Sequence, residues 1–160
     1  MFVKKLFSSV YTFWVLLAEG VGGLSGWLSR DGMKRYMATA VKPPLTPPGP
    51  LFPIVWTILY LLMGIGAARV YRTPASNARS KGLGVFLLQL GVNFFWSIIF
   101  FSLEAYGFAL LWLLLLWGLV LWMIVLFYRV DKTAGLMQIP YLLWMSFAAY
   151  LNYGVWMLNR

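Results

Sequence analysis

Aromatic and amide side chains, rather than charged ones, are the groups in this sequence that could bind a ligand. The sequence has 9 Trp and 9 Tyr, but no Cys, no His and only 4 acidic residues. Without His and Cys it lacks the commonest metal ligands, the usual general base and a thiolate nucleophile. We therefore expect no metal site and no hydrolytic centre of the protein's own, so any chemistry would come from a bound ligand.

Several of these side chains recur at helical spacing on three apolar segments. Asn93 and Trp96 follow Gln89 at intervals of four and three residues, and Trp56 and Tyr60 are also one turn apart. A further stripe contains Tyr141, Trp144, Ala148, Leu151 and Val155. If these faces point inward, they would line a nearly uncharged hollow that holds a flat apolar ligand by stacking and by hydrogen bonds from Asn93 or Tyr60. The alternative is that the aromatic residues only pack the helices together.

A proline-rich segment precedes one of these faces. Six of the eight prolines lie between Lys42 and Tyr60. Because proline fixes φ and removes a backbone donor, residues from Lys42 to Pro50 cannot form a regular helix or strand. Pro53 falls where a helix tolerates proline, in the first turn. We predict a stiff loop that caps the hollow, with a rigid connector between two spans as the alternative.

The elements that must position these residues are predicted to be membrane-spanning helices. At 62% hydrophobic and 11% charged, the chain has more apolar surface than a soluble domain of this size can bury. Five apolar stretches are long enough to cross a bilayer, at about 6–29, 52–71, 82–103, 108–128 and 134–158. We predict an all-α integral membrane protein, a single domain over residues 1–160. In this five-transmembrane-helix bundle, the proline-rich first loop caps an internal pocket.

The basic residues set the expected orientation of the bundle. The formal net charge is +9, but Lys and Arg are scattered among short connectors instead of gathered on one face. This distribution indicates topology signals and a lipid bilayer as partner, and not nucleic-acid binding. In a five-span arrangement the amino-terminal side collects more of them, which predicts a cytoplasmic amino terminus and a proline loop outside.

Glu19 is the one acidic residue deep within a predicted span. A charge in that position costs roughly 2.5 to 3.5 kcal/mol on insertion scales, so Glu19 should face the bundle interior or be neutral. It could be a site residue of a proton-coupled exporter of aromatic cations. Equally, it could be a protonated carboxyl group that is hydrogen-bonded to a neighbouring helix.

The sequence resembles the TspO/MBR family, the translocator proteins once called peripheral benzodiazepine receptors. The likeness extends over about residues 36–156. It rests on four motifs in order: Lys42-Pro43 with Thr46-Pro47-Pro48, Val55-Trp56-Thr57-Ile58-Leu59-Tyr60 with Met63-Gly64, Gln89-Leu90 with Asn93 and Trp96, and Pro140-Tyr141 through Trp144, Phe147-Ala148 and Leu151-Asn152-Tyr153.

The resemblance implies five packed helices, a pocket closed by the first connector and frequently a homodimer, here in a bacterial cell membrane. It also implies porphyrins, protoporphyrin IX or haem, as ligands, with no obligatory cofactor. Some bacterial members are described as degrading protoporphyrin in light, and Trp56 and Trp144 would then be the catalytic positions. Carried onto this sequence, the ligand-binding residues are Tyr36, Pro47, Trp56, Tyr60, Asn93, Trp96, Trp144, Phe147, Ala148 and Leu151.

Some positions depart from the family pattern. Leu45 stands where the K-P-x-W element usually has Trp, Tyr36 and Met37 stand in place of a Trp-Tyr pair, and Trp112 replaces an acidic residue. The cholesterol-recognition pattern also fails, so we predict no sterol function.

The sequence thus predicts a membrane receptor or carrier for porphyrin-like ligands, linked to tetrapyrrole or oxidative-stress handling. A light-dependent porphyrin-degrading enzyme, the Glu19-dependent exporter and a purely structural subunit are the alternatives.

Overall fold

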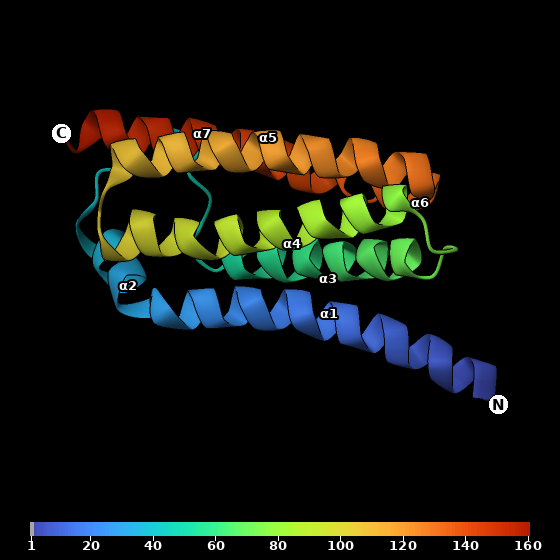
Figure 1. Cartoon of the computed structure of the whole chain (residues 1–160). Coiled ribbons are helices and arrows are strands. Elements are labelled where there is room, and N and C mark those ends of the chain that lie inside the picture. Colours follow the sequence, from blue (N-terminus) through green and yellow to red (C-terminus); the bar gives the residue numbers. More distant parts are fainter. Residues whose placement is uncertain (1) are drawn as a thin grey trace.

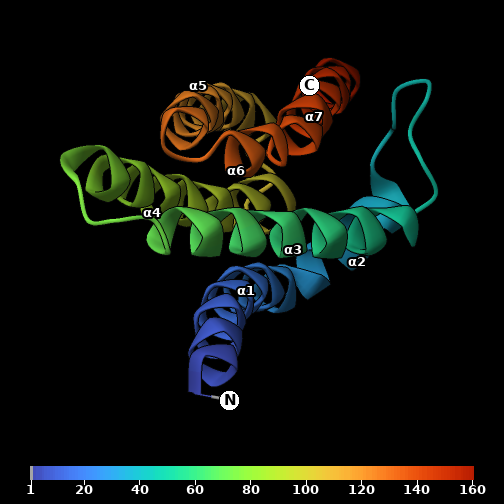
Figure 2. The same cartoon turned by 90° about the vertical axis from the view of Figure 1, so that its right-hand side faces the viewer.

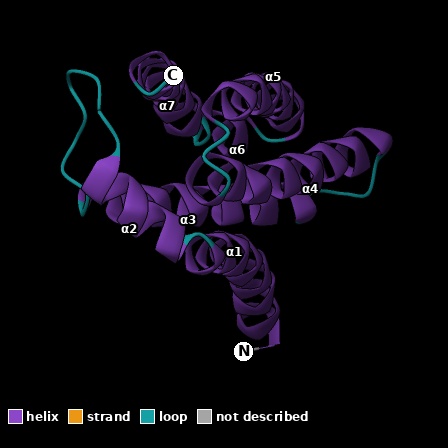
Figure 3. Cartoon of the chain, turned by 90° about the vertical axis from the view of Figure 1, so that its left-hand side faces the viewer, coloured by secondary structure: helices purple, strands orange, loops and turns teal. Residues whose placement is uncertain are grey.

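The protein is all-helical over the residues that the structure, a computed structural model, describes: residues 2–160, with side chains from residue 8 onward (Figure 1). Figure 3 shows helices joined by loops and, within that range, no strand. The elements in chain order are α1 (Phe2–Leu28), α2 (Arg30–Thr39), α3 (Leu51–Tyr71), α4 (Asn77–Ser97), the π-helix η1 (Ile98–Ser102), α5 (Tyr106–Val130), α6 (Lys132–Leu136) and α7 (Ile139–Leu158). The predicted all-α class is confirmed.

Four helical segments of the described chain are long and apolar enough to cross a membrane. They are Leu51–Tyr71, Asn77–Ser102, Tyr106–Val130 and Lys132–Leu158, and they coincide with the last four predicted spans. The first predicted span corresponds to α1, which has 27 residues but does not meet the same criterion of length and composition. Its apolar run is interrupted by Glu19 and by several Gly and Ser residues.

The long helices α1, α3, α4, α5 and α7 are stacked in three layers, and α3 crosses α1, α5 and α7 at an angle (Figures 1 and 2). The outer layers are α1 on one side and α5 with α7 on the other, and α3 and α4 lie between them. The main contacts join α1 to α3, α4 to α5, and α5 to α7, whereas α3 and α7 do not pack closely together. The amino and carboxyl termini lie at opposite ends of the bundle (Figure 1).

Small residues allow the close approach of α1 and α3. A Cβ atom added at Gly64 would lie only 2.5 Å from the Cα atom of Val15. Ala18 on α1 and Ala67 on α3 are completely buried. Since lipid tails are as apolar as the helices, such backbone-to-backbone packing is a main source of attraction between helices in a membrane.

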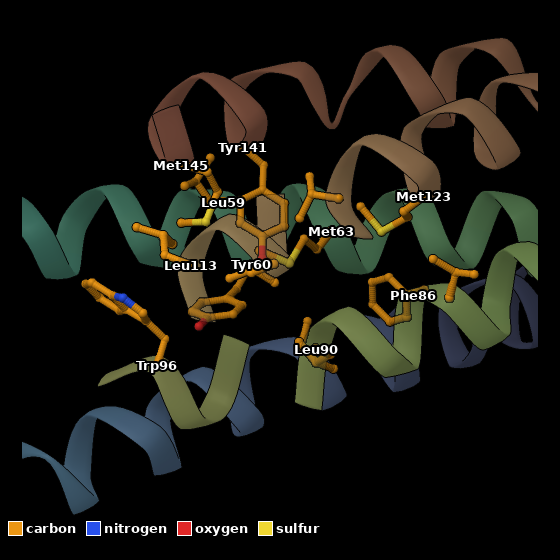
Figure 4. Close-up of a cluster of buried hydrophobic side chains, with 14 of the residues drawn as sticks. Leu59, Tyr60, Met63, Phe86, Leu90, Trp96, Leu113, Met123, Tyr141 and Met145 are labelled. Carbon is orange, nitrogen blue, oxygen red and sulfur yellow. The ribbon is translucent and has the colours of Figure 1, made fainter. Parts of the chain in front are cut away.

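Large apolar side chains fill the middle of the bundle (Figure 4). Met63 of α3, Phe86 of α4, Met123 of α5 and Met145 of α7 have no exposed surface. The flexible thioether side chains of methionine fit irregular gaps between helices. The centre of the bundle is therefore a packed core.

The predicted connector 30–51 contains a helix as well as the proline-rich loop. Helix α2 packs on η1, where a Cβ atom at Gly32 would lie 2.5 Å from the carbonyl oxygen of Phe101. The Arg35 guanidinium pairs with Glu104 and donates a hydrogen bond to the carbonyl of Ser102, 3.1 Å away. These contacts stabilise the short helix α2, which has no long run of apolar residues of its own.

The loop after α2 is irregular, as its prolines predict, and it is tied to α7. The Tyr150 hydroxyl donates to the carbonyl of Pro44 at 2.9 Å. The Asn159 side chain accepts from the N–H of Val41 at 3.0 Å and donates to its carbonyl at 2.8 Å. Part of the loop extends away from the helices (Figure 3), and Leu45 within the loop is 79% exposed.

The last predicted span is divided into two helices. The Asp131 carboxylate accepts a hydrogen bond from the N–H of Ala134 at 3.0 Å and so caps α6. Residues Met137 and Gln138 form a turn, and α7 begins immediately after it, with Pro140 in its first turn. Proline is favoured there because the first N–H groups of a helix have no intrahelical partner.

Candidate functional site

An apolar groove lies between α3 and α7, where these two helices are not in close contact. Its volume is about 420 Å³. The lining consists only of apolar side chains, Trp included: Val55, Ile58 and Leu59 of α3, and Pro140, Leu143, Trp144 and Phe147 of α7. Ile58 is 52% exposed and Leu143 is 65% exposed, so the groove opens along the side of the bundle.

Aromatic rings support one wall of the groove. Trp144 has its ring centroid 5.9 Å from that of Phe52 and 5.6 Å from that of Phe147. Phe52 belongs to the first turn of α3, so Trp144 connects the two helices at this end of the groove. Such edge and offset contacts hold the indole in one orientation.

The indole N–H of Trp144 is a buried donor that has no acceptor among the described residues. Leaving a buried polar group unpaired costs about 1 to 3 kcal/mol. Trp144 lines the groove, but its Nε1 atom is buried, so a ligand oxygen could accept this hydrogen bond only after a small shift of the indole.

Trp56 lies beside the groove-lining residues, next to two tyrosines. Its ring stacks on Tyr60 with centroids 5.6 Å apart and meets Tyr141 edge-on at 6.3 Å. It is partly buried and does not belong to the lining of the groove.

Tyr60 and Asn93 belong to a buried hydrogen-bond network that joins α3, α4 and α7. The Tyr60 hydroxyl donates to Oδ1 of Asn93 at 2.8 Å, and Nδ2 of Asn93 donates to the Tyr141 hydroxyl at 2.5 Å. The Tyr141 hydroxyl donates in turn to Oε1 of Gln89 at 2.8 Å. The polar groups predicted to bind a ligand are thus engaged with one another. In a membrane such a network stabilises the assembly of the helices.

Trp96 and Tyr36 lie in a second aromatic cluster around η1. Trp96 stacks on Phe100 with ring centroids 5.1 Å apart and donates to Oδ1 of Asn152 at 3.2 Å. The Tyr36 ring lies 5.4 Å from that of Phe100, and the Lys42 ammonium sits 5.0 Å from its face. Burial, together with the nearby Tyr106, raises the pKa of the Tyr36 phenol to about 12. Neither predicted site residue lines the groove.

The remaining predicted residues are divided between the groove and its surroundings. Phe147 lines it, whereas Ala148 and Leu151 are buried on α7 and Pro47 lies in the proline-rich loop. No residue of that loop lines the groove, so the predicted cap is not formed over it. Glu19 is half-buried on α1, a helix that contributes nothing to the groove lining.

Sequence reasoning missed five of the groove-lining residues: Val55, Ile58, Leu59, Pro140 and Leu143. Helical spacing could have found them. Residues 55, 58 and 59 share a face with one another, as do 140, 143, 144 and 147, because residues three and four apart are neighbours on a helix.

Stacked apolar helices define a multi-pass α-helical membrane protein, and an open apolar groove lies between two of these helices. Residues 14–157 match the model of the TspO/MBR family. The chain belongs to this family and is an integral membrane protein.

Similar proteins occur in bacteria and in animals. The Tryptophan-rich protein TspO of Chlorobaculum tepidum is 42% identical over 125 residues, which are 78% of this chain and 79% of that protein. Protein CrtK of Rhodobacter capsulatus is 44% identical over 119 residues, 74% of each chain. The Translocator protein of Bos taurus is 31% identical over 147 residues, 90% of this chain and 87% of the relative.

Proposed function

We propose that this chain is a membrane receptor or carrier that binds a flat, apolar, porphyrin-like ligand in the groove between α3 and α7. The observation that carries the proposal is the groove itself, about 420 Å³ with an entirely apolar lining and one unpaired indole N–H. Ligand sites in proteins are commonly 300 to 1,000 Å³, apolar, and equipped with few polar groups. Membership of a family that includes translocator proteins supports the same function.

The lateral opening of the groove suits a ligand that reaches the protein through the bilayer. A porphyrin can place one edge between Trp144 and Ile58 and leave the rest of its ring in lipid, so its full size need not fit inside the groove. Its carboxylate or carbonyl oxygens could accept from Nε1 of Trp144 after a small shift of the buried indole.

Blocking the groove from its lipid side tests this proposal without disturbing the core. We expect Ile58→Trp to fill the groove and to weaken protoporphyrin IX binding at least about tenfold, because the added ring occupies the ligand's place. Binding is measured in the dark by quenching of tryptophan fluorescence and, independently, by the absorbance of the bound porphyrin.

Ile54→Trp is the matched control for this variant. Ile54 is on the same helix, one turn earlier, and is 57% exposed, but it does not line the groove. Equal affinities of the Ile58→Trp and Ile54→Trp proteins would place the ligand elsewhere and overturn the proposal.

Light-dependent degradation of the porphyrin is the second candidate function. It is favoured by the position of Trp144 in the groove lining, where an oxidisable indole would touch the bound ring. The porphyrin would be the sensitiser and dioxygen the oxidant. Trp56, which follows the groove-lining Val55 and contacts Tyr60 and Tyr141, is the second indole of this hypothesis.

We also propose that α1 is a fifth span, which the opposite placement of the two termini supports (Figure 1). Four further points stay predictions. They are a homodimer, a bacterial cell membrane as the location, a link to tetrapyrrole or oxidative-stress handling, and proton-coupled export through Glu19.

A further inference from the structure

A second, polar cavity lies at the end of the bundle where the amino terminus is found (Figure 1). Its volume is about 220 Å³. Among the described residues, it is lined by Tyr11 of α1, Arg69 of α3, Arg72 and Thr73 after α3, and Asp131 between α5 and α6. Every lining residue carries a polar group, in contrast to the groove between α3 and α7.

Both arginines of this cavity are held in place by described contacts. Arg69 pairs with Asp131 through Nε and Nη2, each 3.3 Å from a carboxylate oxygen. Asp131 is itself fixed, because it caps α6. Nη1 of Arg72 donates to the Tyr11 hydroxyl at 3.5 Å, and its guanidinium carbon lies 5.8 Å from the centre of that ring. The two guanidinium groups are thus positioned before any ligand arrives.

The charge at this cavity is positive. Two guanidinium groups line it against a single carboxylate. Among the described side chains, the helix ends on the same side of the bundle carry four more cations, those of Arg79, Lys81, Arg129 and Lys132. An anion in the cavity would therefore experience a net attraction that extends beyond the two arginines.

The cavity lies at the level expected for lipid headgroups. Arg72 directly follows the candidate span Leu51–Tyr71, and Asp131 directly follows the span Tyr106–Val130. The positive-inside bias of the sequence predicts that this end faces the cytoplasm. Basic pockets between helices on that side commonly receive anionic headgroups.

We propose that this cavity binds a phosphate group, supplied either by the headgroup of an anionic phospholipid or by phosphate in solution. Arg69 and Arg72 would bind its oxygens, since the planar guanidinium group matches phosphate with paired N–H donors. At about 30 Å³ for each water, the cavity has room for a phosphate and several waters. Asp131 limits the affinity, because its carboxylate repels the anion while it orients Arg69.

Three variants separate a specific site from general attraction by a basic surface. Arg72→Gln removes one of the two ligand-binding cations, and we expect phosphate-group binding to weaken about fivefold. Arg129→Gln removes a cation from the same end of the bundle but outside the cavity lining, so binding should be unchanged. Asp131→Asn removes the repulsive carboxylate while asparagine still caps α6, and binding should become tighter.

Two probes distinguish the sources of the phosphate group. The protein is placed in nanodiscs of phosphatidylcholine, and inorganic phosphate is titrated while the midpoint of thermal unfolding is followed against sodium chloride of equal ionic strength. In the second arm, binding of phosphatidylglycerol in preference to phosphatidylcholine is measured by native mass spectrometry. A response to phosphatidylglycerol alone identifies a lipid site, and a response to inorganic phosphate identifies a site for the soluble anion.

Three results would overturn the proposal. The first is that neither probe binds the unmodified protein better than its control. The second is that Arg72→Gln and Arg129→Gln weaken binding equally, which indicates only a diffuse charge effect. The third is that Arg72→Gln leaves the binding of both probes unchanged, since this places the phosphate group outside the cavity.

Discussion

Trp144 brings two different properties to the groove between α3 and α7, an apolar ring and a donor without an acceptor. The ring is held by Phe52 and Phe147, so it does not turn away to satisfy its N–H group within the described structure. A ligand oxygen at this position would remove an existing penalty as well as add a contact.

Trp144→Phe separates these two properties, because it keeps an aromatic ring and removes the donor. We expect protoporphyrin IX to bind about three- to tenfold more weakly in the dark, the value of a single hydrogen bond. The substitution removes no hydrogen bond from the ligand-free protein, because the indole N–H has no partner in the described part of the chain. The thermal stability of the ligand-free protein should therefore not decrease for that reason. The affinity is measured by titration of the bound porphyrin's absorbance, and the stability of the free protein is measured by thermal unfolding.

Trp27→Phe is the control for this change, since Trp27 is exposed on α1 and does not line the groove. It should leave porphyrin affinity unaltered. Illumination in air at saturating porphyrin then tests the second candidate function: if bleaching in the unmodified and Trp144→Phe proteins proceeds as with free pigment, Trp144 has no part in degradation.

At the scale of the elements, the position of α3 between α1 and α4 determines where the groove forms. Gly64 permits α3 to lie against the backbone of α1, and the Tyr60–Asn93 hydrogen bond draws it towards α4. Helix α7 is held by α5 instead. Because each of the two helices has its main partners elsewhere, the space between them stays open.

Gly64→Ala tests the seam between α1 and α3. The new Cβ atom would lie 2.5 Å from the Cα and 2.8 Å from the backbone nitrogen of Val15, neither of which can rotate away. We expect a loss of about 1 to 3 kcal/mol of stability, as for overpacked cores. Thermal or denaturant unfolding in a fixed detergent measures it.

Gly84→Ala on α4 is the matched control, because nothing lies within 4 Å of its added Cβ atom. It should leave stability unchanged or raise it by about 0.5 to 1 kcal/mol, since alanine favours a helix over glycine. If both variants were equally stable, α1 and α3 would not be packed as described.

For the molecule as a whole, the number of spans decides on which side of the membrane the amino terminus lies. The proline-rich loop and the polar cavity lie at opposite ends of α3, so they face opposite surfaces whether or not α1 crosses the membrane. If α1 lay at one membrane surface, Phe2 and α2 would be on the same side of the membrane. If α1 crosses the bilayer, they are on opposite sides.

The absence of cysteine from the chain makes this question accessible to labelling. We expect Phe2→Cys and Ala38→Cys proteins to react with a membrane-impermeant maleimide from opposite sides of sealed vesicles, because α1 crosses the bilayer between them. The cysteine-free parent gives the background. Reaction of both single-cysteine proteins from the same side would contradict a five-span topology.

Sequence patterns were sufficient for features that depend on neighbours along the chain. The runs Leu51–Tyr71 and Tyr106–Val130 are helical and apolar because their own composition demands it, and the proline cluster excludes regular structure by its covalent geometry. The inward orientation of Asn93 and Trp96 follows from helical spacing and the penalty for polar groups in lipid, and both are buried.

Patterns were insufficient where a residue's role depends on a distant neighbour. Helix α2 was missed because Tyr36 gains its burial from η1, more than sixty residues further along the chain. Asn93 and Tyr60 were predicted to hold a ligand, but their spacing does not reveal that they lie within 2.8 Å of each other.

The sequence by itself therefore determined a helical membrane protein of aromatic character with an irregular first loop, because composition, periodicity and proline geometry act locally. The tertiary structure decided that Trp144 and Phe147 face an open groove while Ala148 and Leu151 on the same helix are buried. It also brought Arg69, Arg72 and Asp131 around one cavity. The physical reason is that helical spacing specifies the face on which a side chain lies, whereas the separation between two helices depends on how each one packs against the rest of the bundle.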